Sequence, residues 1–265
     1  MITDERVTPV PSAESSWPVG AVFQATVATD PATLLGFGSW QAMEAAKDIS
    51  TGLLMNFEGS GATMMDESPH VNVVTAVGNA TQSTTQKKFG SKSLALDGTG
   101  DYLSVAANPL FDTIFAANFT IDFWAYISTV TDRRYFASYG SGNNGFGFLI
   151  ENTGVYLGFY INGSAANWVP WSPSLNTWIH FAVVRYGGNT LKLFVNGVLL
   201  GSAWTNASSG AAAGTPLKIG TSYAGTQNLS GYLDAFRITN YPRWTSNFTP
   251  PAAPVEEIYQ WKRTA

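Results

Sequence analysis

The chain has 265 residues, of which 45% are hydrophobic and only 12% are charged, and it contains no cysteine. The hydrophobic fraction is sufficient for a core, and the low charge favours a β-sandwich over a helical cytosolic enzyme. The net charge of −4 and the lack of a basic stripe argue against nucleic acid as the main partner. Without cysteine, a disulfide framework and a thiolate metal site are excluded. No continuous apolar run of about 20 residues occurs, so membrane insertion is not expected.

The first 50 residues predict an extended arm. Residues 1–18 mix Pro, Ser and Thr with charged residues, which is typical of an extended or disordered segment. A short strand is expected next, and Asp30 before Pro31 predicts one helical turn that Gly36 ends. The arm is too small to bury its own large side chains, so we expect it to dock onto a partner or onto another copy of the chain. The residues predicted to dock are Trp17, Val19, Phe23, Phe37 and Trp40.

The same arm contains two motifs, W-P-V-G-x-V-F at 17–23 and D-P-A-T-L-L-G-F-G-S-W at 30–40. Together they resemble a short segment found in bacteriophage tail and baseplate proteins. In this chain Ala21 replaces the usual Ser, Phe23 replaces the usual Tyr, and Leu35 replaces the usual aromatic residue. The resemblance covers roughly residues 17–43 and implies a virion location, with attachment to other tail or baseplate proteins. Such appendages are often trimers, and an arm without its own core is compatible with a homo-oligomer.

The rest of the chain predicts many short strands separated by Gly- and Asn-rich turns, a pattern typical of an antiparallel sandwich or jelly roll. The strongest signal spans Trp178–Trp204, where alternating segments lead into Asn196-Gly197, a pair that favours a type I′ hairpin turn. The other predicted strands are Leu53–Phe57, Val71–Val77, Ser93–Asp97, Tyr102–Val105, Phe119–Ile127, Tyr135–Tyr139, Phe146–Glu151, Val155–Tyr160, Leu217–Gly220 and Gly231–Thr239.

Six segments of this region occur in an order that resembles a known family. They are LLMNFEGSGATMMDES, KFGSKSLALDGTGDYLSV, FTIDFWAYIS, TWIHFAVVRYGGNTLKLFVNGVLLG, LKIGTSY and GYLDAFRITNYPRW. Their order resembles laminin G-like, concanavalin A-like lectin/glucanase domains, over about residues 52–248. The resemblance implies an all-β fold of two curved antiparallel sheets in a jelly roll, closed by pairing of Gly231–Thr239 with Leu53–Phe57.

The expected organisation therefore has three parts. Residues 1–50 form the extended arm for virion attachment, and residues 51–249 form the laminin G-like sandwich. Residues 250–265 form a Pro-rich linker and a short tail, whose Ile258, Tyr259 and Trp261 indicate docking.

The catalytic motif of the glucanase branch is missing. That branch carries E-x-D-x-E on one strand, because period-two alternation puts the three carboxylates on one sheet face. The corresponding stretch here has Thr120 and Trp124 at the two glutamate positions, so no activity of that type is expected. Asp122 is then interpreted as part of a structural network, and His180 as a packed sheet residue. The sequence G-x-G-x-x-G at 140–145 is interpreted as a hairpin loop.

A structural Ca²⁺ ion is a further expectation. The resemblance implies such an ion in related sandwiches, and Glu58, Asp66 and Asp234 are the matching positions here. Asp97 and Asp101, in Asp-Gly-Thr-Gly-Asp, offer a second acidic turn. Asp and Gly also form tight turns without any metal, so both interpretations stay open.

Glycan binding by such folds uses aromatic rings in loops or on a sheet face, with amides beside them to bond the sugar hydroxyls. Trp168-Val169-Pro170-Trp171 is notable, because Pro170 places two indoles on one rigid loop. Each ring can instead be buried against its neighbours. The candidate glycan-binding residues are Tyr139, Asn143, Tyr160, Asn167, Trp168, Trp171 and Tyr223.

The sequence thus favours a non-enzymatic phage tail or baseplate protein that displays a laminin G-like domain for binding a host surface glycan or protein. Two alternatives remain. The first is a purely structural hub or decoration protein that contacts only other tail proteins. The second is a glycan-cleaving enzyme with an unfamiliar catalytic pair. Since fold alone does not determine function, the choice depends on the site.

Overall fold

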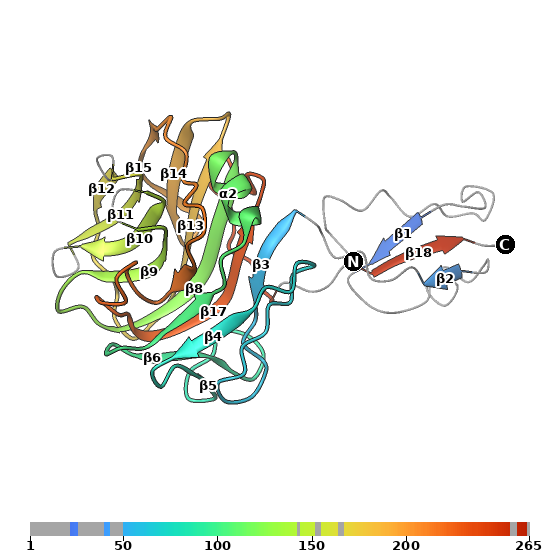
Figure 1. Ribbon diagram of the computed structural model, residues 1–265, viewed down its shortest axis with the longest axis horizontal. Helices are drawn as coiled ribbons and strands as arrows, with labels where there is room; N and C mark the ends of the chain where they lie inside the picture. Colours follow the sequence, from blue (N-terminus) through green and yellow to red (C-terminus); the bar gives the residue numbers. More distant parts are fainter. Residues whose placement is uncertain are drawn as a thin grey trace. The chain divides into compact units, whose positions relative to one another are not determined.

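The computed structural model describes residues 22–25, 40–42, 50–141, 144–151, 155–163, 167–254 and 259–263 (Figure 1). The chain divides into two compact units. One unit consists of Met1–Ile49 together with Glu256–Ala265, and the other consists of Ser50–Val255. No helix in the part of the chain that the structure describes is long and apolar enough to cross a membrane.

The larger unit is a sandwich of two antiparallel sheets, which confirms the predicted all-β class. One sheet has seven strands in the order β12 (Asn167–Pro170), β11 (Tyr156–Ile161), β10 (Phe146–Glu151), β9 (Arg134–Tyr139), β16 (Leu217–Ile219), β7 (Tyr102–Val105) and β4 (Val74–Val77). The other sheet has eight strands: β15 (Val198–Thr205), β14 (Thr190–Val195), β13 (Trp178–Tyr186), β8 (Phe119–Thr129), β17 (Ser230–Thr239), β6 (Ser93–Asp97) and β5 (Thr81–Ser83), with β3 (Thr51–Met55) paired to β17.

The inner faces of the two sheets meet in a core of phenylalanines. Because side chains alternate along a strand, every second residue of β8 points inward. The ring centroid of Phe123 lies 5.1 to 5.6 Å from those of Phe136, Phe148, Phe181 and Phe236, which come from both sheets. The same alternation leaves the other residues of β8 on the outer face, where the candidate site lies.

Two predicted local features are confirmed. Asn196 and Gly197 both have positive φ, 49° and 76°, and Val195 pairs directly with Val198 across the β14–β15 hairpin. The last long strand closes the sandwich as expected, because Phe236, Arg237 and Ile238 of β17 pair with β3.

Three elements of the sandwich were not predicted. Helix α2 (Pro109–Ala116) begins after Asn108, whose side chain accepts a hydrogen bond from the Leu110 amide, and it buries Phe111, Ile114 and Phe115. The short strands β5 and β12 were also missed. The segment with Trp168 and Pro170 is therefore an edge strand rather than a rigid loop. Pro170 is tolerated there because an edge strand has one side free of ladder hydrogen bonds.

The smaller unit contains a three-stranded antiparallel sheet. Its strands are β1 (Val22–Ala25), β18 (Tyr259–Arg263) and β2 (Trp40–Ala42), with β18 in the centre. In register, Trp261 lies opposite Phe23 and Ala42, and Arg263 lies opposite Trp40. The C-terminal tail thus docks onto the N-terminal arm of the same chain. Trp17, Val19, Phe37 and the predicted helical turn at 31–35 lie outside the described residues.

Candidate functional site

The outer face of the eight-stranded sheet changes character along its strands. On β8, the outward positions are Thr120, Asp122, Trp124 and Tyr126 in turn, because inward residues alternate with them. On β17, a bulge at Ala235, with φ of 48°, shifts the register between Asp234 and Arg237. Along β8, the end of the face at Asp122 is closed, the middle at Trp124 is covered by a loop, and the end at Tyr126 is open.

At the closed end, Asp122 and Arg237 form a buried ion pair. Arg237 donates from Nε to Asp122 Oδ1 at 3.1 Å and from Nη2 to Oδ2 at 2.8 Å. His180 Nε2 and Arg243 Nε lie 3.7 and 3.8 Å from the same carboxylate. Burial alone would raise the pKa of Asp122, but Arg237 above all, with His180 and Arg243, holds that pKa well below its usual range. The structural network expected for Asp122 is confirmed.

The chain after β17 covers this end. Trp244 and Phe248 stack with their ring centroids 3.8 Å apart, and each meets the His180 ring edge-on. Thr120 Oγ1 donates to the carbonyl of Tyr241 at 2.9 Å. Thr120 and Asp122, two positions of the stretch that was compared with the glucanase motif, are therefore buried, and His180 is the packed sheet residue that was expected.

In the middle of the face, a loop covers Trp124. Lys88 Nζ lies 3.8 Å from the Trp124 ring centroid, and Phe89 packs edge-on against the same indole. Asp234 fixes this loop, because its Oδ2 accepts hydrogen bonds from the amides of Lys88 at 2.8 Å and Phe89 at 3.0 Å. Burial raises the pKa of Asp234 to about 6, although these amide donors oppose the shift.

The other two predicted calcium ligands also accept hydrogen bonds from protein groups. Burial alone would raise the pKa of Glu58, but its carboxylate accepts from the amide and hydroxyl of Ser91 and from the Lys92 amide, and these donors hold that pKa below its usual value. Asp66 is buried and accepts from the amides of Leu54, Ser68 and Asn72, among others.

These contacts bear on the metal prediction. Within the described ranges, no group of three or more His, Asp and Glu side chains could hold a metal ion. Glu58, Asp66 and Asp234 therefore do not gather as a cluster of three carboxylates in this part of the chain. N–H and O–H donors, which a cation would have to replace, occupy their oxygens. A structural Ca²⁺ ion at the predicted positions stays a prediction.

At the open end, three aromatic rings line up across adjacent strands. Tyr232 of β17 pairs with Tyr126 of β8, which pairs with Trp178 of β13. Both neighbouring pairs have centroids 5.7 Å apart and meet edge to face. All three rings are half-buried, so each retains some access to solvent. We call Tyr232, Tyr126 and Trp178 the aromatic ladder.

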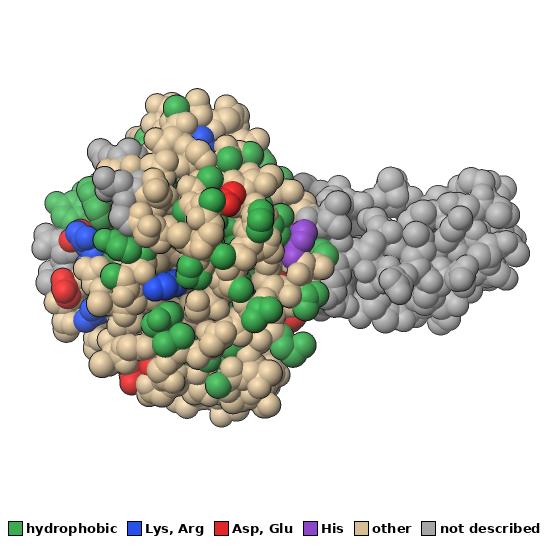
Figure 2. All heavy atoms as spheres, viewed as in Figure 1, with side chains coloured by type: hydrophobic (Ala, Val, Ile, Leu, Met, Phe, Trp, Pro, Cys, Tyr) green, Lys and Arg blue, Asp and Glu red, His purple; other side chains and the backbone are tan. Residues whose placement is uncertain are grey.

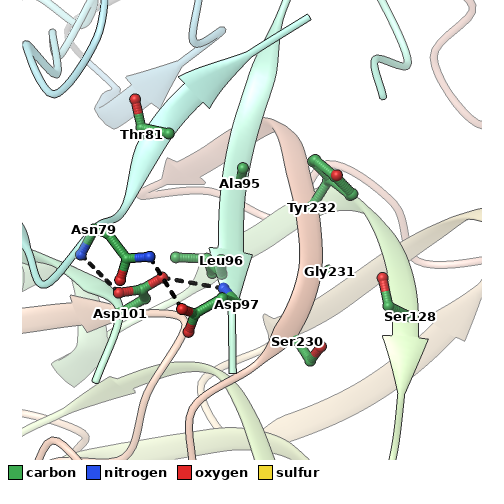
Figure 3. A pocket seen from close by; sticks show the side chains of 10 residues that line it. All are labelled: Asn79, Thr81, Ala95, Leu96, Asp97, Asp101, Ser128, Ser230, Gly231 and Tyr232. Carbon is green, nitrogen blue, oxygen red and sulfur yellow. Dashed lines mark hydrogen bonds between the residues drawn. The ribbon is translucent and has the colours of Figure 1, made fainter. Parts of the chain in front are cut away.

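A pocket of about 320 Å³ lies at the Tyr232 end of this ladder (Figure 3). Ala95 of β6 pairs with Tyr232 on one side and with Thr81 of β5 on the other, so a small side chain separates two larger ones and leaves a hollow. The pocket is lined by Asn79, Thr81, Ala95, Leu96, Asp97, Asp101, Ser128, Ser230, Gly231 and Tyr232.

A hydrogen-bond network holds the polar wall of the pocket. The buried Asp101 accepts from the amide of Asn79 at 2.8 Å and from the amide of Asp97 at 3.1 Å. Asp97 accepts from Asn79 Nδ2 at 3.0 Å and from the Thr99 amide at 2.7 Å. These donors, Asn79 first, lower the pKa of the exposed Asp97 carboxyl, which stays ionised at neutral pH.

Of the predicted glycan-binding residues, Trp168 and Tyr160 lie on the outer face of the seven-stranded sheet, and Tyr223 lies in a turn after β16. Trp168 is 37% exposed, and its ring covers Gly158 of the neighbouring strand: a Cβ on that glycine would lie 2.1 Å from the indole. Tyr160 covers Gly147 in the same way. Tyr223 is 43% exposed. The Trp168 and Tyr160 rings keep one face toward the sheet, and all three rings stay candidates for ligand contact.

The remaining predicted residues divide as follows. Tyr139 requires correction: it is buried, and its hydroxyl donates to Asp112 of α2 at 2.8 Å, because the unpredicted helix covers it. Trp171 is half-buried and packs edge-on against Phe181 in the core, with centroids 5.3 Å apart. Asn167 lies beside Trp168 on edge strand β12. Asn143 lies outside the described residues.

Sequence reasoning missed the aromatic ladder, although part of its signal was present. Tyr126 and Tyr232 both fall at outward positions of strands that were predicted, so alternation placed them on the same side as Asp122 and Asp234. The strand pairing that aligns them was not available from one sequence. The pocket gathers residues from Asn79 to Tyr232, and no local spacing reveals such a site.

The sequence also matches a family. The model of a laminin G-type family, described as the Concanavalin A-like lectin/glucanases superfamily, matches residues 97–246. This chain belongs to that superfamily. No curated protein sequence matches the chain.

Solved structures with a similar fold include binding domains of botulinum neurotoxins. The receptor binding domain of the C/D mosaic serotype has a TM-score of 0.58 at 16% identity, over 74% of this chain and 49% of that one. The neurotoxin DC binding domain in complex with rat synaptotagmin II has a TM-score of 0.55 at 15% identity, over 73% and 48%. The same domain in complex with SialylT has a TM-score of 0.54 at 16% identity, over 73% and 48%. This chain thus spans about half the length of these structures, and the likeness concerns the fold.

Proposed function

We propose that the protein is a non-enzymatic, lectin-type binding protein whose sandwich recognises a glycan on a host cell surface. The observation that carries the proposal is the open end of the eight-stranded sheet, where the aromatic ladder adjoins a polar pocket. Aromatic faces beside hydroxyl, amide and carboxylate groups are the surroundings in which sugar rings bind. The receptor-binding domains of similar fold support a recognition role rather than catalysis.

The arm supports a place for this module on a phage tail or baseplate. The motifs at 17–23 and 30–40 are the basis, and attachment to other tail proteins is the proposed role of the smaller unit. Pairing of β18 with β1 and β2 supports a role for residues 256–265 in the same unit. Trimer formation through this unit belongs to the proposal as well.

The rival functions have less support. A glycan-cleaving enzyme needs paired carboxylates in an accessible cleft. Asp122 is buried against Arg237, and Thr120 and Trp124 stand where glutamates would. A purely structural tail component would need no open polar pocket, although the packed Trp171 is what such a protein would also show.

The test is binding of the purified full-length chain to an oligosaccharide array and to intact bacterial cells, in Ca²⁺ and in EDTA. Saturable glycan binding supports the proposal, and its loss in EDTA would add a metal requirement. No binding to any glycan or cell, together with assembly onto isolated tails through residues 1–49, would establish the structural alternative.

A further inference from the structure

We infer that the pocket beside Tyr232 binds the ring of an uncharged hexopyranose sugar and excludes acidic sugars such as sialic acid. This inference rests on the proposed glycan-binding function and names its subsite and its sugar class. The pocket is distinct from the surface around Trp168, where glycan binding was predicted from the sequence.

The first argument is shape. The pocket volume of about 320 Å³ is at the lower end of the ~300–1,000 Å³ of typical ligand sites, so it suits one small ring rather than a long segment. Its floor is Ala95, and Tyr232 and Thr81 stand on either side (Figure 3). Tyr232 offers an aromatic wall against which the C–H face of a sugar can pack.

The second argument is hydrogen bonding. A carboxylate oxygen has two lone pairs, and each oxygen of Asp97 receives one bond from the protein, from Asn79 and from Thr99. The Asp97 side chain also interacts with that of Asp101, and because it is exposed its carboxylate keeps acceptor capacity for a sugar hydroxyl. Asp101 fixes the backbone of both Asn79 and Asp97, so the wall is held in place before a ligand arrives.

The third argument is charge. Asp97 and Asp101 line the pocket, and no Lys, Arg or His belongs to its lining. An anionic sugar would meet an ionised Asp97 without a compensating cation, and such a like-charge arrangement is strongly unfavourable. A neutral sugar, whose hydroxyls donate to the same carboxylate, gains charge-assisted hydrogen bonds instead. The pocket thus discriminates by charge as well as by shape.

The aromatic ladder indicates where a longer glycan would continue. Tyr126 and Trp178 extend from Tyr232 across two further strands, with rings 5.7 Å apart. In the other direction β5 is the last strand of the sheet. The sugar in the pocket is then the terminal sugar of the glycan, and the sugars that precede it in the glycan lie along Tyr126 and Trp178.

The experiment measures affinities of the full-length chain for neutral oligosaccharides ending in glucose, galactose, mannose or N-acetylglucosamine, each beside its sialic-acid-capped form. We expect binding to at least one neutral member and at least tenfold weaker binding to its capped form. Asp97→Asn removes the charge but keeps the size of the side chain, and it should weaken neutral binding about tenfold, the effect of one lost charge-assisted bond. Ala95→Trp fills the pocket and should abolish binding.

Asp132→Asn, which removes an exposed carboxylate outside the pocket, is the matched control and should leave these affinities unchanged. All variants are first compared by thermal unfolding. Glycan binding that Trp168→Ala abolishes and Ala95→Trp leaves intact would overturn the pocket assignment while the proposed function stands. Preference for the sialylated forms would overturn the charge argument. Absence of binding to every glycan would overturn the proposed function itself.

Discussion

The carboxylate of Asp122 and the guanidinium of Arg237 face each other in a two-bond pair, at 3.1 and 2.8 Å, inside the cover formed by the chain after β17. Both side chains are almost completely removed from solvent. Asp122 is the middle residue of the stretch that, by its sequence resemblance, corresponds to the glucanase E-x-D-x-E motif, and here it is buried in an ion pair. The part of this outer sheet face that remains accessible lies at the other end of the strands, beside Tyr232.

Replacement of Asp122 by Asn should destabilise the sandwich severely. The substitution leaves Arg237 buried without its counter-charge, and breaking a buried pair in this way costs about 3–5 kcal/mol. Urea unfolding of the variant measures the loss. Asp132→Asn, which changes an exposed carboxylate, is the control and should stay within about 0.5 kcal/mol of the parent. Equal stabilities for the two variants would contradict the structural role.

The ionisation of Asp234 should make stability depend on pH around 6. Its pKa is about 6 in the folded protein and 3.8 in the reference state, so folding favours the protonated form. The resulting stabilisation is complete below pH 3.8 and is lost as the pH rises through 6, by about 1–2 kcal/mol between pH 5 and 7.5.

Asp234→Asn provides the comparison for this effect, because it removes the titration and keeps the size of the side chain. Unfolding free energies of both proteins are measured from pH 5 to 7.5. As the pH falls, the unfolding free energy of the parent should increase relative to that of Asp234→Asn. Parallel pH profiles would show that Asp234 does not titrate in this range.

The contact between Trp168 and Gly158 predicts a rescue. A Cβ added at Gly158 would lie 2.1 Å from the indole, so Gly158→Ala must displace the ring, at about 1–3 kcal/mol. In a Trp168→Ala background the same substitution meets no ring, and its cost should fall close to zero. Urea unfolding of the four proteins of this cycle gives the coupling. An equal cost in both backgrounds would argue against the observed packing.

The two neighbouring tryptophans should differ in stability effect. Trp171 packs against Phe181 at the edge of the core, and Trp171→Ala should lower stability by about 2–4 kcal/mol. Trp168→Ala removes a ring that is 37% exposed and should cost less than half as much. Thermal unfolding compares them directly. A larger loss of stability at Trp168 would contradict this ranking. Because Trp171→Ala is expected to destabilise the sandwich, loss of glycan binding in that variant alone is not evidence of ligand contact.

The tail strand should hold the smaller unit together. Deletion of residues 256–265 removes β18, the central strand, and with it the pairing partners of both β1 and β2. Hydrogen exchange should show loss of protection at 22–25 and 40–42, while the unfolding midpoint of the sandwich stays the same. Deletion of 264–265 alone, which leaves β18 intact, serves as the control. Unchanged protection after the longer deletion would contradict the pairing.

Much of the fold was predictable because its signals are local. Alternation identified β6, β7 and β10 to the residue, and Asn196-Gly197 identified the hairpin turn. Helix α2 was missed, although Asn108 before Pro109 is a recognisable cap, because eight residues are too few for a helical period to be recognised. That omission led to the error at Tyr139, which the helix buries.

The sequence by itself determined the class of fold, since this depends on residue type and on period-two alternation, and its resemblance to the glucanase branch indicated the loss of the two glutamates. The tertiary structure supplied the partner of Asp122, Arg237. Only the tertiary structure decided which carboxylates receive protein N–H groups and which rings remain exposed. It also placed Tyr232, Asp97 and Asn79 around one pocket. Strand order and register set these contacts between distant segments, and neither follows from the spacing of residues along the chain.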